Sequence, residues 1–395
     1  MTKTLIIGNG VAGDSAARIV SRKREDREIK IFTGEKYPFY QRTRLGEVLS
    51  GDTTAEDLIL HDTGWYRNHD IDLHLETWVK KISPDKKFVK TKTGNKYSYD
   101  KLLLAPGAKP AIPPIEGLDK ENVFALRTLN DVQKIVSRLS EVEEALVIGG
   151  GLLGLESAYA LNKRGLTVKV VEALPLIMGK QLDKVGSRYV KSRLEDTGIE
   201  FKLETKVKKL AGEDSISSAV LSSGESIATD LAIISAGITP RTKLAESAGL
   251  ETSRGILVDK HLRTSRPEIF AAGDAIELGG NCYGIWPPAL EQGKIAGNNL
   301  IGEEEEYNGS LSYYKLKVAN IDLISAGNRD KSRADKVLAQ EDETNQTYKK
   351  FFLNESNELI GAILVGDKAC YPIVLNGLRN RADFDEINDN NRLMD

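Results

Sequence analysis

The sequence predicts an α/β protein, because a glycine-rich turn between an apolar strand and a helix occurs in it twice. The first copy begins TLIIGNGVAG at residue 4, and the second begins ALVIGGGLLG at residue 145. Both match G-x-G-x-x-G in strand-turn-helix context, the arrangement of a Rossmann-like dinucleotide-binding domain. One such motif alone also describes an ordinary tight turn. Two of them predict two dinucleotide-binding domains.

Composition and charge exclude several classes of function. At about 150 residues per domain, the 395 residues predict two or three domains. Hydrophobic residues make up 40% and charged residues 29%, and the net charge of −3 gives no general attraction to nucleic acid or an anionic membrane. No stretch approaches the roughly 18 apolar residues of a membrane span, and the N-terminus enters a strand without a basic region or cleavage site. We therefore expect a cytoplasmic protein.

The cysteines and histidines predict neither a disulfide framework nor a metal site. Cys282 and Cys370 are far apart and lie in no C-x-x-C or metal-ligand spacing. The four histidines, at positions 61, 69, 74 and 261, are scattered. We therefore expect no metal.

Each glycine of the first copy has a separate role. The apolar run from Leu5 to Ile7 reads as a buried strand, and a helix follows to about residue 21. Gly8 permits the tight turn, Gly10 lets the backbone approach a pyrophosphate, and Gly13 allows the helix to pack closely on the strand. The helix N-terminus offers unpaired N–H groups and the positive end of its dipole to the phosphates.

A second strand, Glu28 to Phe32, ends at Gly34 and Glu35. Glu35 is placed to accept hydrogen bonds from a ribose. The alternative is a solvated turn carboxylate.

The second copy repeats this order more closely. A strand at 145–148 leads to Gly149, Gly151 and Gly154, a helix runs to residue 164, and a strand at 167–171 leads to Glu172. An acid about 20 residues after the turn completes the dinucleotide pattern. Its carboxylate would pair with both ribose hydroxyls and repel a 2′-phosphate, so Glu172 favours NADH over NADPH. A plain surface glutamate is the alternative, and Lys180 would weaken the preference.

Two further strands mark the domain boundaries. The strand in YDKLLLAPGAKPAIPPIEG, residues 99–117, runs into a glycine turn and a proline-rich connection typical of a crossover between domains. A strand at 231–235 ends similarly in Ala236 and Gly237. We expect the chain to leave the first domain near Pro110 and return near Asp230. The expected domains are 1–110 with 231–303, then 111–230, then a small C-terminal domain at 304–395.

The segment TSRPEIFAAGDAIE, residues 264–277, predicts a short strand that brings Gly273 and Asp274 to a helix N-terminus or turn beside the first dinucleotide. Asp274 can hold a sugar hydroxyl. It can equally be a helix N-cap.

In this order the segments resemble the FAD-dependent pyridine nucleotide-disulfide oxidoreductase family of the glutathione reductase fold. The matching motifs are GNGVAG, LLLAPGA, GGGLLGLE, VVE, SAGITP and FAAGDA. The resemblance implies FAD on the first domain, with Asp274 on the ribityl chain, and NADH on the second. It also implies that Glu156, seventh after Gly149, faces the nicotinamide and the flavin. The implied FAD contacts are Gly8, Gly10, Val11, Ala12, Gly13, Glu35, Arg42, Arg44, the backbones of Val79 and Trp286, Ala105, Gly107, Gly273, Asp274 and Lys317. The implied NADH contacts are Gly149, Gly151, Leu152, Leu153, Gly154, Glu172 and Gly237. Of the FAD contacts, Arg42, Val79, Trp286 and Lys317 could each instead be structural.

The segment KYPFYQRTRLGEVLSG, residues 36–51, is where acceptor chemistry is set in this family, and it contains no cysteine. A disulfide relay needs two cysteines within bridging distance, and a coenzyme A disulfide reductase needs one thiol facing the flavin, so both subclasses are excluded. Ferredoxin reductases of the monooxygenase type carry a lysine where this chain has Glu47, which argues against them. We take Glu156 and Glu47 as the candidate catalytic residues.

The same segment resembles NADH:rubredoxin oxidoreductases and the nucleotide-binding part of assimilatory nitrite reductases. The C-terminal stretches at 312–328 and 358–371 are similar to the short last domain of that subgroup, and their alternating pattern predicts a small sheet followed by a helix. The sequence has no cysteine-rich cluster or sirohaem region, so we expect no nitrite reduction by this chain alone.

The resemblance implies a flavoprotein that takes hydride from NADH and passes single electrons to a small acidic iron-sulfur carrier, with rubredoxin as the favoured partner. Arg42, Arg44, Lys315 and Lys317 are candidates for a basic docking rim, or alternatively phosphate contacts or solvated charges. The other functions considered are an NADH oxidase or diaphorase, and a flavin- and NADH-binding redox sensor or electron-transfer subunit. Monomer and homodimer both remain open.

Overall fold

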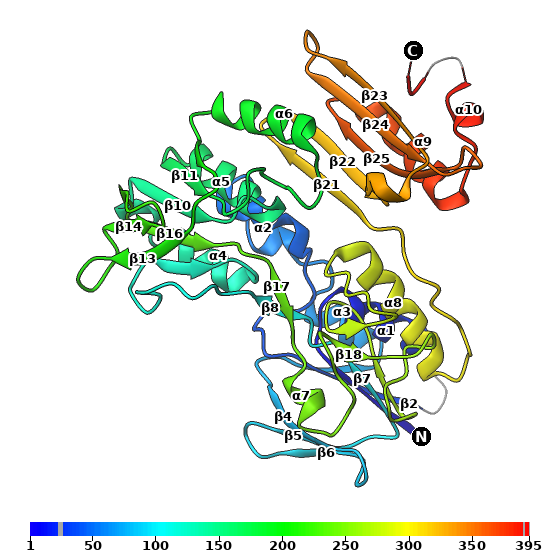
Figure 1. Cartoon of the computed structure of the whole chain (residues 1–395). Coiled ribbons are helices and arrows are strands. Elements are labelled where there is room, and N and C mark those ends of the chain that lie inside the picture. The colour runs from blue at the N-terminus through cyan, green and yellow to red at the C-terminus, as the bar shows by residue number, and fades with distance from the viewer. Residues whose placement is uncertain (23–26, 390–391, 395) are drawn as a thin grey trace. The chain divides into compact units, whose positions relative to one another are not determined.

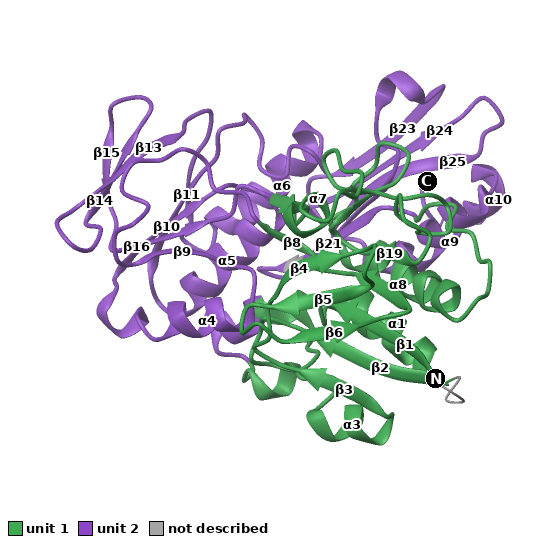
Figure 2. Cartoon of the chain, turned by 90° about the horizontal axis from the view of Figure 1, so that it is seen from below, with its two compact units in different colours: residues 1–45, 53–109, 238–310 green, residues 46–52, 110–237, 311–395 purple. Residues whose placement is uncertain are grey.

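The computed structural model describes residues 1–22, 27–389 and 392–394 (Figure 1). The chain divides into two compact units, coloured separately in Figure 2. Unit 1 holds residues 1–45, 53–109 and 238–310, and unit 2 holds residues 46–52, 110–237 and 311–395. Both units are therefore assembled from separate stretches of chain.

A five-stranded parallel sheet forms the centre of unit 1. Its order is β3-β2-β1-β7-β19, with bounds β1 (Thr2–Ile7), β2 (Arg27–Phe32), β3 (Ile71–His74), β7 (Lys101–Leu104) and β19 (Ile269–Ala271). Its central strands are buried apolar runs, as expected when both faces of a parallel sheet are covered.

Two helices of unit 1 pack unusually closely. A Cβ added to Gly293 of α8 (Trp286–Leu300) would lie 2.4 Å from the carbonyl oxygen of Ala12 on α1 (Val11–Arg22). One at Gly297 would lie 3.0 Å from the Cα of Ala16. Small residues on both helices therefore let their backbones meet.

The remaining elements of unit 1 are short. A three-stranded antiparallel sheet, β4 (Val79–Ser83), β5 (Phe88–Thr91) and β6 (Lys96–Ser98), is inserted between β3 and β7. The short helices are η1 (Arg42–Arg44), η2 (Glu56–Leu58), α3 (Thr63–Asn68) and α7 (Lys243–Glu246). Two-stranded pairs join β8 (Ala108–Pro110) to β17 (Ile238–Pro240) and β18 (Ile256–Leu257) to β20 (Ile276–Glu277).

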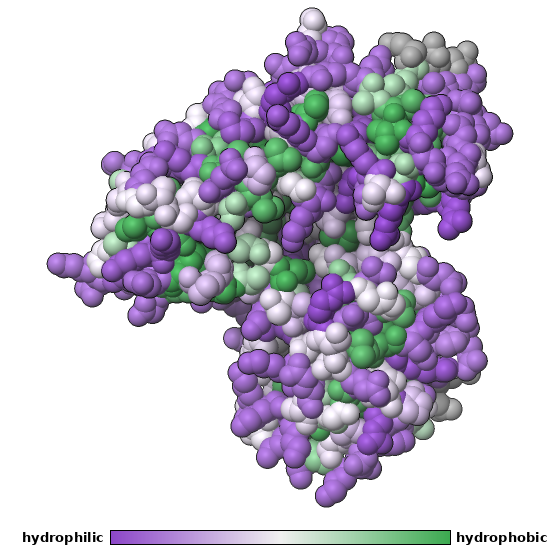
Figure 3. Space-filling view, viewed as in Figure 1, coloured by the Kyte–Doolittle hydropathy of each residue, from purple (hydrophilic) through white to green (hydrophobic). Residues whose placement is uncertain are grey.

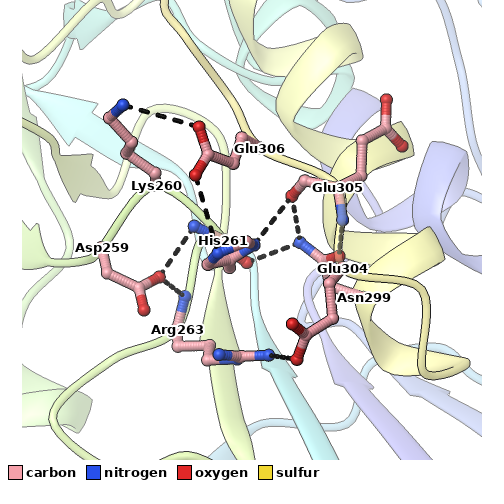
Figure 4. Close-up of polar contacts among 8 residues, drawn as sticks. All are labelled: Asp259, Lys260, His261, Arg263, Asn299, Glu304, Glu305 and Glu306. Carbon is pink, nitrogen blue, oxygen red and sulfur yellow. Dashed lines mark hydrogen bonds and ion pairs between the residues drawn. The ribbon is translucent and has the colours of Figure 1, made fainter.

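A buried asparagine fixes the last part of unit 1 (Figure 4). Asn299, only 4% exposed, donates to the carbonyl oxygens of His261 (2.8 Å) and Glu305 (2.9 Å) and accepts from the Glu305 amide (2.8 Å). Around it, Arg263 pairs with Glu304 at 2.8 Å. The acidic run that follows α8 is thus tied to the body of unit 1.

Unit 2 contains a second parallel sheet with the order β12-β11-β10-β16-β9. Its strands are β9 (Val123–Ala125), β10 (Glu144–Ile148), β11 (Thr167–Val171), β12 (Glu200–Lys202) and β16 (Leu231–Ile234). Its helices are α4 (Leu129–Val136), η3 (Leu139–Glu141), α5 (Leu152–Lys163) and α6 (Lys184–Glu195). A three-stranded antiparallel sheet, β13 (Val207–Ala211), β14 (Ser218–Leu221) and β15 (Ser226–Ala228), lies between β12 and β16 in the chain.

The C-terminal part of unit 2, residues 311–395, is called the C-terminal module below. Its antiparallel sheet has the order β21-β22-β25-β24-β23, with bounds β21 (Tyr313–Val318), β22 (Ile321–Gly327), β23 (Lys336–Asp342), β24 (Thr347–Leu353) and β25 (Leu359–Val365). Helices α9 (Tyr371–Asn380) and α10 (Phe384–Ile387) follow, with η4 (Lys331–Arg333) and η5 (Lys368–Cys370) before them. One face of the sheet and α9 share a core that includes Phe351, Leu364 and Val374.

The two units differ from the expected domain boundaries in three places. The strand expected to open the second part of the first domain is β16, which pairs with β10 in unit 2, so the return to unit 1 falls at Ile238 rather than at residue 231. Hydrogen bonding to the neighbouring strand decides this membership. Residues 46–52 also group with unit 2, although the sequence order assigns them to the first domain, and the last boundary falls at 310/311 rather than 303/304.

The described residues form no helix that is long and apolar enough to cross a membrane. Polar residues predominate on the face shown in Figure 3, with apolar residues in small groups. The cytoplasmic location stays a prediction.

Candidate functional site

The turn after β1 has one open glycine between two crowded ones. A Cβ at Gly8, where φ is +106°, would lie 2.0 Å from the carbonyl oxygen of Ala105. One at Gly13 would lie 2.0 Å from the carbonyl oxygen of Gly8. A Cβ added at Gly10 would meet no heavy atom within 4 Å apart from its chain neighbours. The open backbone at Gly10, beside Val11 at the start of α1, therefore fits an approaching phosphate group.

The turn after β10 has the same geometry. A Cβ at Gly149, where φ is +118°, would lie 2.3 Å from the carbonyl oxygen of Ser235, and one at Gly154 would lie 2.0 Å from that of Gly149. A Cβ added at Gly151, the N-cap of α5, would meet no heavy atom within 4 Å apart from its chain neighbours. The first residues of α5 are Leu152 and Leu153. Each of the two turns thus leaves open space beside a helix N-terminus.

Side chains hold Glu35 in unit 1. Its carboxylate accepts from the Tyr40 hydroxyl at 2.6 Å and from Arg42 Nη2 at 2.7 Å. Burial would lower the pKa of Arg42, but Tyr40 and Glu35 outweigh it and raise the pKa. Glu35 is therefore a fixed acceptor rather than a freely solvated turn carboxylate. The direct contact of Arg42 with FAD stays a prediction.

Main-chain donors hold Glu172 in unit 2. Its carboxylate accepts from the amides of Gly150 at 2.7 Å and Leu174 at 2.8 Å. An ionised carboxylate has about four acceptor positions, so two contacts leave capacity for ribose hydroxyls. Glu172 is thus a positioned acid at the end of β11, as binding of an unphosphorylated ribose requires.

Buried Gln292 holds the turn that carries Asp274. The Gly273 amide donates to Oε1 of Gln292, which is 1% exposed, at 2.8 Å. Asp274 lies in the turn between β19 and β20. No helix starts there, so the alternative role of Asp274 as a helix N-cap is wrong. Gln292 was not identified from the sequence, because nothing in a helical glutamine indicates which turn it will meet.

Except for Lys317, the other predicted FAD contacts also lie in unit 1. Ala105 and Gly107 follow β7, Val79 begins β4, Arg44 lies in η1 and Trp286 begins α8. Gly107 has a φ of +67°, and Gly237, which follows β16 in unit 2, has a φ of +100°. Lys317 lies on β21 in unit 2, and its side chain is outside the described part of the structure.

A buried acid behind the first turn was missed by sequence reasoning. Asp14 of α1 is 1% exposed and accepts from His61 Nδ1 at 2.8 Å and from the Tyr66 hydroxyl at 3.3 Å. The same hydroxyl accepts from the Asn9 amide at 3.0 Å, and the His61 ring stacks on Trp65 at 3.9 Å. These contacts support the turn through residues about 50 positions away. No local motif announces them.

The two candidate catalytic acids lie on neighbouring helices of unit 2. Glu47 belongs to α2 (Leu45–Ser50), and a Cβ at Gly46 would lie 3.9 Å from the Cβ of Glu156 on α5. Arg164 Nε, just after α5, donates to the carbonyl oxygen of Leu49 at 3.0 Å, which caps the end of α2. Glu156 is partly buried, and this burial raises the pKa of its carboxyl to about 7. Near neutral pH, Glu156 can therefore hold or release a proton.

Neither cysteine lies in the 36–51 segment. Cys282 is partly buried in unit 1, and Cys370 is buried in the C-terminal module. Burial raises the pKa of both thiols, that of Cys370 to about 11. Both thiols are therefore protonated at neutral pH and poor nucleophiles.

Known proteins share this arrangement. Residues 2–293 match the family described as pyridine nucleotide-disulphide oxidoreductase, and residues 313–382 match the rubredoxin NAD+ reductase C-terminal domain. The nitrite reductase [NAD(P)H] of Bacillus subtilis is 35% identical over 97% of this chain and 48% of its own length. The NADH-rubredoxin oxidoreductase of Clostridium acetobutylicum is 30% identical over 98% of this chain and 97% of its own length. The solved structure of a NAD-dependent persulfide reductase from A. fulgidus is similar with a TM-score of 0.91 and 28% identity, over 98% of this chain and 78% of that one.

The chain belongs to the pyridine nucleotide-disulphide oxidoreductase family. The two glycine-rich turns of this chain fit the FAD and NADH that the family uses as cofactors. The chain spans about half the length of the nitrite and nitrate reductase relatives that it matches.

Proposed function

We propose that this protein transfers electrons from NADH to rubredoxin through bound FAD. The observation that carries the proposal is the C-terminal module, because residues 313–382 match the last domain of rubredoxin reductases. The similarity to the clostridial oxidoreductase over nearly the full length of both chains supports it. The absence of cysteine from residues 36–51 removes the thiol route to other acceptors.

Residues of unit 1 would bind FAD. The open backbone at Gly10 and the α1 N-terminus would hold its pyrophosphate, while Glu35 and Asp274 would accept hydrogen bonds from its sugar hydroxyls. Bound FAD accepts a hydride and can deliver the two electrons one at a time. The fixed acceptors orient the cofactor for that chemistry.

Residues of unit 2 would bind NADH, and one of them, Glu156, would hold a proton. The α5 N-terminus at Gly151 would hold the pyrophosphate, and Glu172 would select the unphosphorylated ribose. Glu156, with its pKa raised by burial, would be neutral below about pH 7 and charged above it. We propose that the neutral form avoids a charge beside the reacting rings.

The electron carrier would be met by basic residues. Arg42 and Arg44 lie in unit 1, and Lys315 and Lys317 lie on β21 in unit 2. An acidic carrier would be attracted to them in a transient encounter that salt weakens. These four residues remain candidates for the docking contacts.

A second candidate function is an electron-transfer part of a larger enzyme. The chain covers 48% of the B. subtilis nitrite reductase and 50% of the assimilatory nitrate reductase electron transfer subunit from the same organism. In that case the acceptor would be another redox group of that larger enzyme.

Steady-state turnover with NADH tests the proposal. The FAD-loaded chain is assayed with purified rubredoxin and, separately, with oxygen alone, across a salt series. We expect rubredoxin reduction to be much faster and to slow as salt rises, since the Debye length is only about 10 Å at 0.1 M. Flavin reduction by NADH should change little. Equal rates with oxygen would support an oxidase, and negligible turnover with both would support a sensor or a subunit.

A further inference from the structure

Residues 174–183, between β11 and α6, form hydrogen bonds to the glycine-rich turn after β10, where NADH would bind. The Leu174 amide donates to the Glu172 carboxylate at 2.8 Å, and the Met178 amide donates to the carbonyl oxygen of Gly150 at 2.8 Å. Gly150 itself donates to Glu172. Ile177 is buried against the turn, where a Cβ at Gly150 would lie 3.2 Å from its Cγ2. One end of this segment therefore sets the position of both the turn and the acid.

The C-terminal module holds the other end of the same segment. Ser325 on β22, Ile363 on β25 and Lys350 on β24 are cross-strand neighbours in one row of the sheet. Ser325 Oγ donates to the carbonyl oxygen of Gln181, and Lys350 Nζ forms an ion pair with Asp183. Figure 1 shows this sheet beside α6. Ser325 and Lys350 in this row thus hold Gln181 and Asp183, near the end of the 174–183 segment.

The ion pair is a strong constraint because its lysine is buried. Lys350 is 4% exposed, and Asp183 also accepts from the Tyr348 hydroxyl at 2.7 Å and from the Gly186 amide at 3.0 Å, which caps α6. Burial would raise the pKa of Asp183, but the bonds from Lys350, Gly186 and Tyr348 lower it. Removing Asp183 would leave Lys350 buried without its partner, and removing Lys350 would leave Asp183 half-buried with only its bonds from Tyr348 and Gly186, so either change disfavours the present arrangement.

We propose that Lys350 is a positioning residue for NADH. By holding Asp183 it fixes residues 174–183, and through them the Gly150 backbone and the Glu172 carboxylate. The C-terminal module then contributes to nucleotide affinity in addition to any part it has in meeting a carrier. The inference rests on NADH as the hydride donor and does not depend on which carrier accepts the electrons.

The neighbouring lysine on the same strand provides a matched control. Lys349 points to the opposite face of β24, because successive side chains of a strand alternate. It pairs with Asp367 at 2.7 Å, entirely within the C-terminal module. Lys349→Met and Lys350→Met therefore make the same chemical change on one strand. Only the second releases the 174–183 segment.

Calorimetric titration of the oxidised, FAD-loaded chain with NAD+ tests the proposal. We expect Lys350→Met to raise the NAD+ Kd by about 5- to 20-fold, the loss of roughly one charged hydrogen bond. Lys350→Arg should restore most of the affinity, and Lys349→Met should stay within about two-fold of the wild type. Hydrogen exchange of residues 174–183 should accelerate in Lys350→Met alone. This readout separates positioning from a general loss of stability.

Wild-type NAD+ affinity in folded Lys350→Met would overturn the proposal, as would equal weakening by Lys349→Met. If Lys350→Met does not fold, Asp183→Asn with Lys350→Met removes both charges and keeps a capping side chain. Unchanged affinity in that double variant would also reject the proposal. A chain that binds NAD+ but does not reduce rubredoxin would reject the proposed carrier and leave this inference standing.

Discussion

The two nucleotide turns share a backbone geometry and differ in what surrounds it. In each, the first and last glycines lie against a carbonyl oxygen, and the middle glycine faces open space. The residue after the first glycine differs. Asn9 bonds sideways to Tyr66, whereas Gly150, without a side chain, leaves room for Glu172 and Ile177. The backbone of each turn therefore provides the open space for a phosphate, and the surrounding residues determine how the acid, Glu35 or Glu172, is held.

The two parallel sheets that carry these turns are also similar in strand order. Both parallel sheets place the strand before the glycine-rich turn, β1 or β10, at the centre, and both insert a three-stranded antiparallel sheet before the third strand that follows it, β7 or β16. The helices after the turns then diverge. The seventh residue after the first glycine is Ser15 in unit 1 and Glu156 in unit 2. At this position, only unit 2 therefore has a side chain that can titrate.

The largest effects are expected from alanine substitutions in the glycine-rich turn of unit 2, where Gly149 should matter for stability and Gly151 for NADH binding. Gly149→Ala places a Cβ 2.3 Å from a carbonyl oxygen at a φ of +118°, so we expect unfolding to become easier by at least about 3 kcal/mol. Gly151→Ala has open space, so stability should stay within about 1 kcal/mol while NADH binding falls by about 100-fold. Urea unfolding and flavin reduction by NADH measure the two.

The corresponding variants in unit 1 should behave in the same way: Gly8→Ala should lower stability, and Gly10→Ala should lower FAD retention. Wild-type NADH affinity in Gly151→Ala would show that this opening does not receive the pyrophosphate.

The raised pKa of Glu156 should make unit 2 lose stability as pH rises. The native carboxyl keeps its proton to about pH 7, whereas the unfolded one releases it near 4.5, so the native state binds more protons between these values. Stability then falls through that window, by about 3 kcal/mol in total. Denaturant unfolding between pH 5 and 8 should show this slope in the wild type and lose it in Glu156→Gln.

Ser15 provides the control for this effect. Its buried hydroxyl does not titrate, and it has no hydrogen-bond partner among the described residues. Ser15→Ala should therefore leave the pH slope intact, and an unchanged slope in Glu156→Gln would assign the proton elsewhere.

Removal of the Glu172 carboxylate tests the choice of nucleotide. Glu172→Ala should weaken NADH binding by about 1.5 to 3 kcal/mol, because it removes hydrogen bonds to the ribose and leaves the Gly150 and Leu174 amides without their acceptor. The preference for NADH over NADPH should shrink with it. Specificity constants for both nucleotides give the result, and equal constants in the unmodified protein would rule out selection by Glu172.

The smallest effect is expected at the cysteines, one in each unit. Serine at positions 282 and 370 should leave flavin reduction and acceptor turnover nearly unchanged, because burial keeps both thiols protonated and neither lies in residues 36–51. Stopped-flow traces measure both steps. Loss of turnover with a normal FAD content would reveal a thiol relay.

Much of the local structure was predictable from the sequence. The strand at 167–171 was placed at its observed bounds, and the helix expected to end near residue 21 ends at Arg22. Apolar runs, glycine positions and the spacing to the acid are local signals. The two three-stranded antiparallel sheets, β4–β6 and β13–β15, were not identified, because their strands have only 3 to 5 residues and are recognisable only by their pairing.

The sequence by itself determined the two phosphate turns, the acids that follow them and the lack of a thiol in residues 36–51, because each depends on residues within about 30 positions of one another. Only the tertiary structure decided that β16 belongs to unit 2, that His61 bonds Asp14 across 47 positions, and that Lys350 bonds Asp183 across 167. Such partners are chosen by which surfaces the sheets bring together. A buried charge must then find its counter-charge there, wherever the chain supplies it.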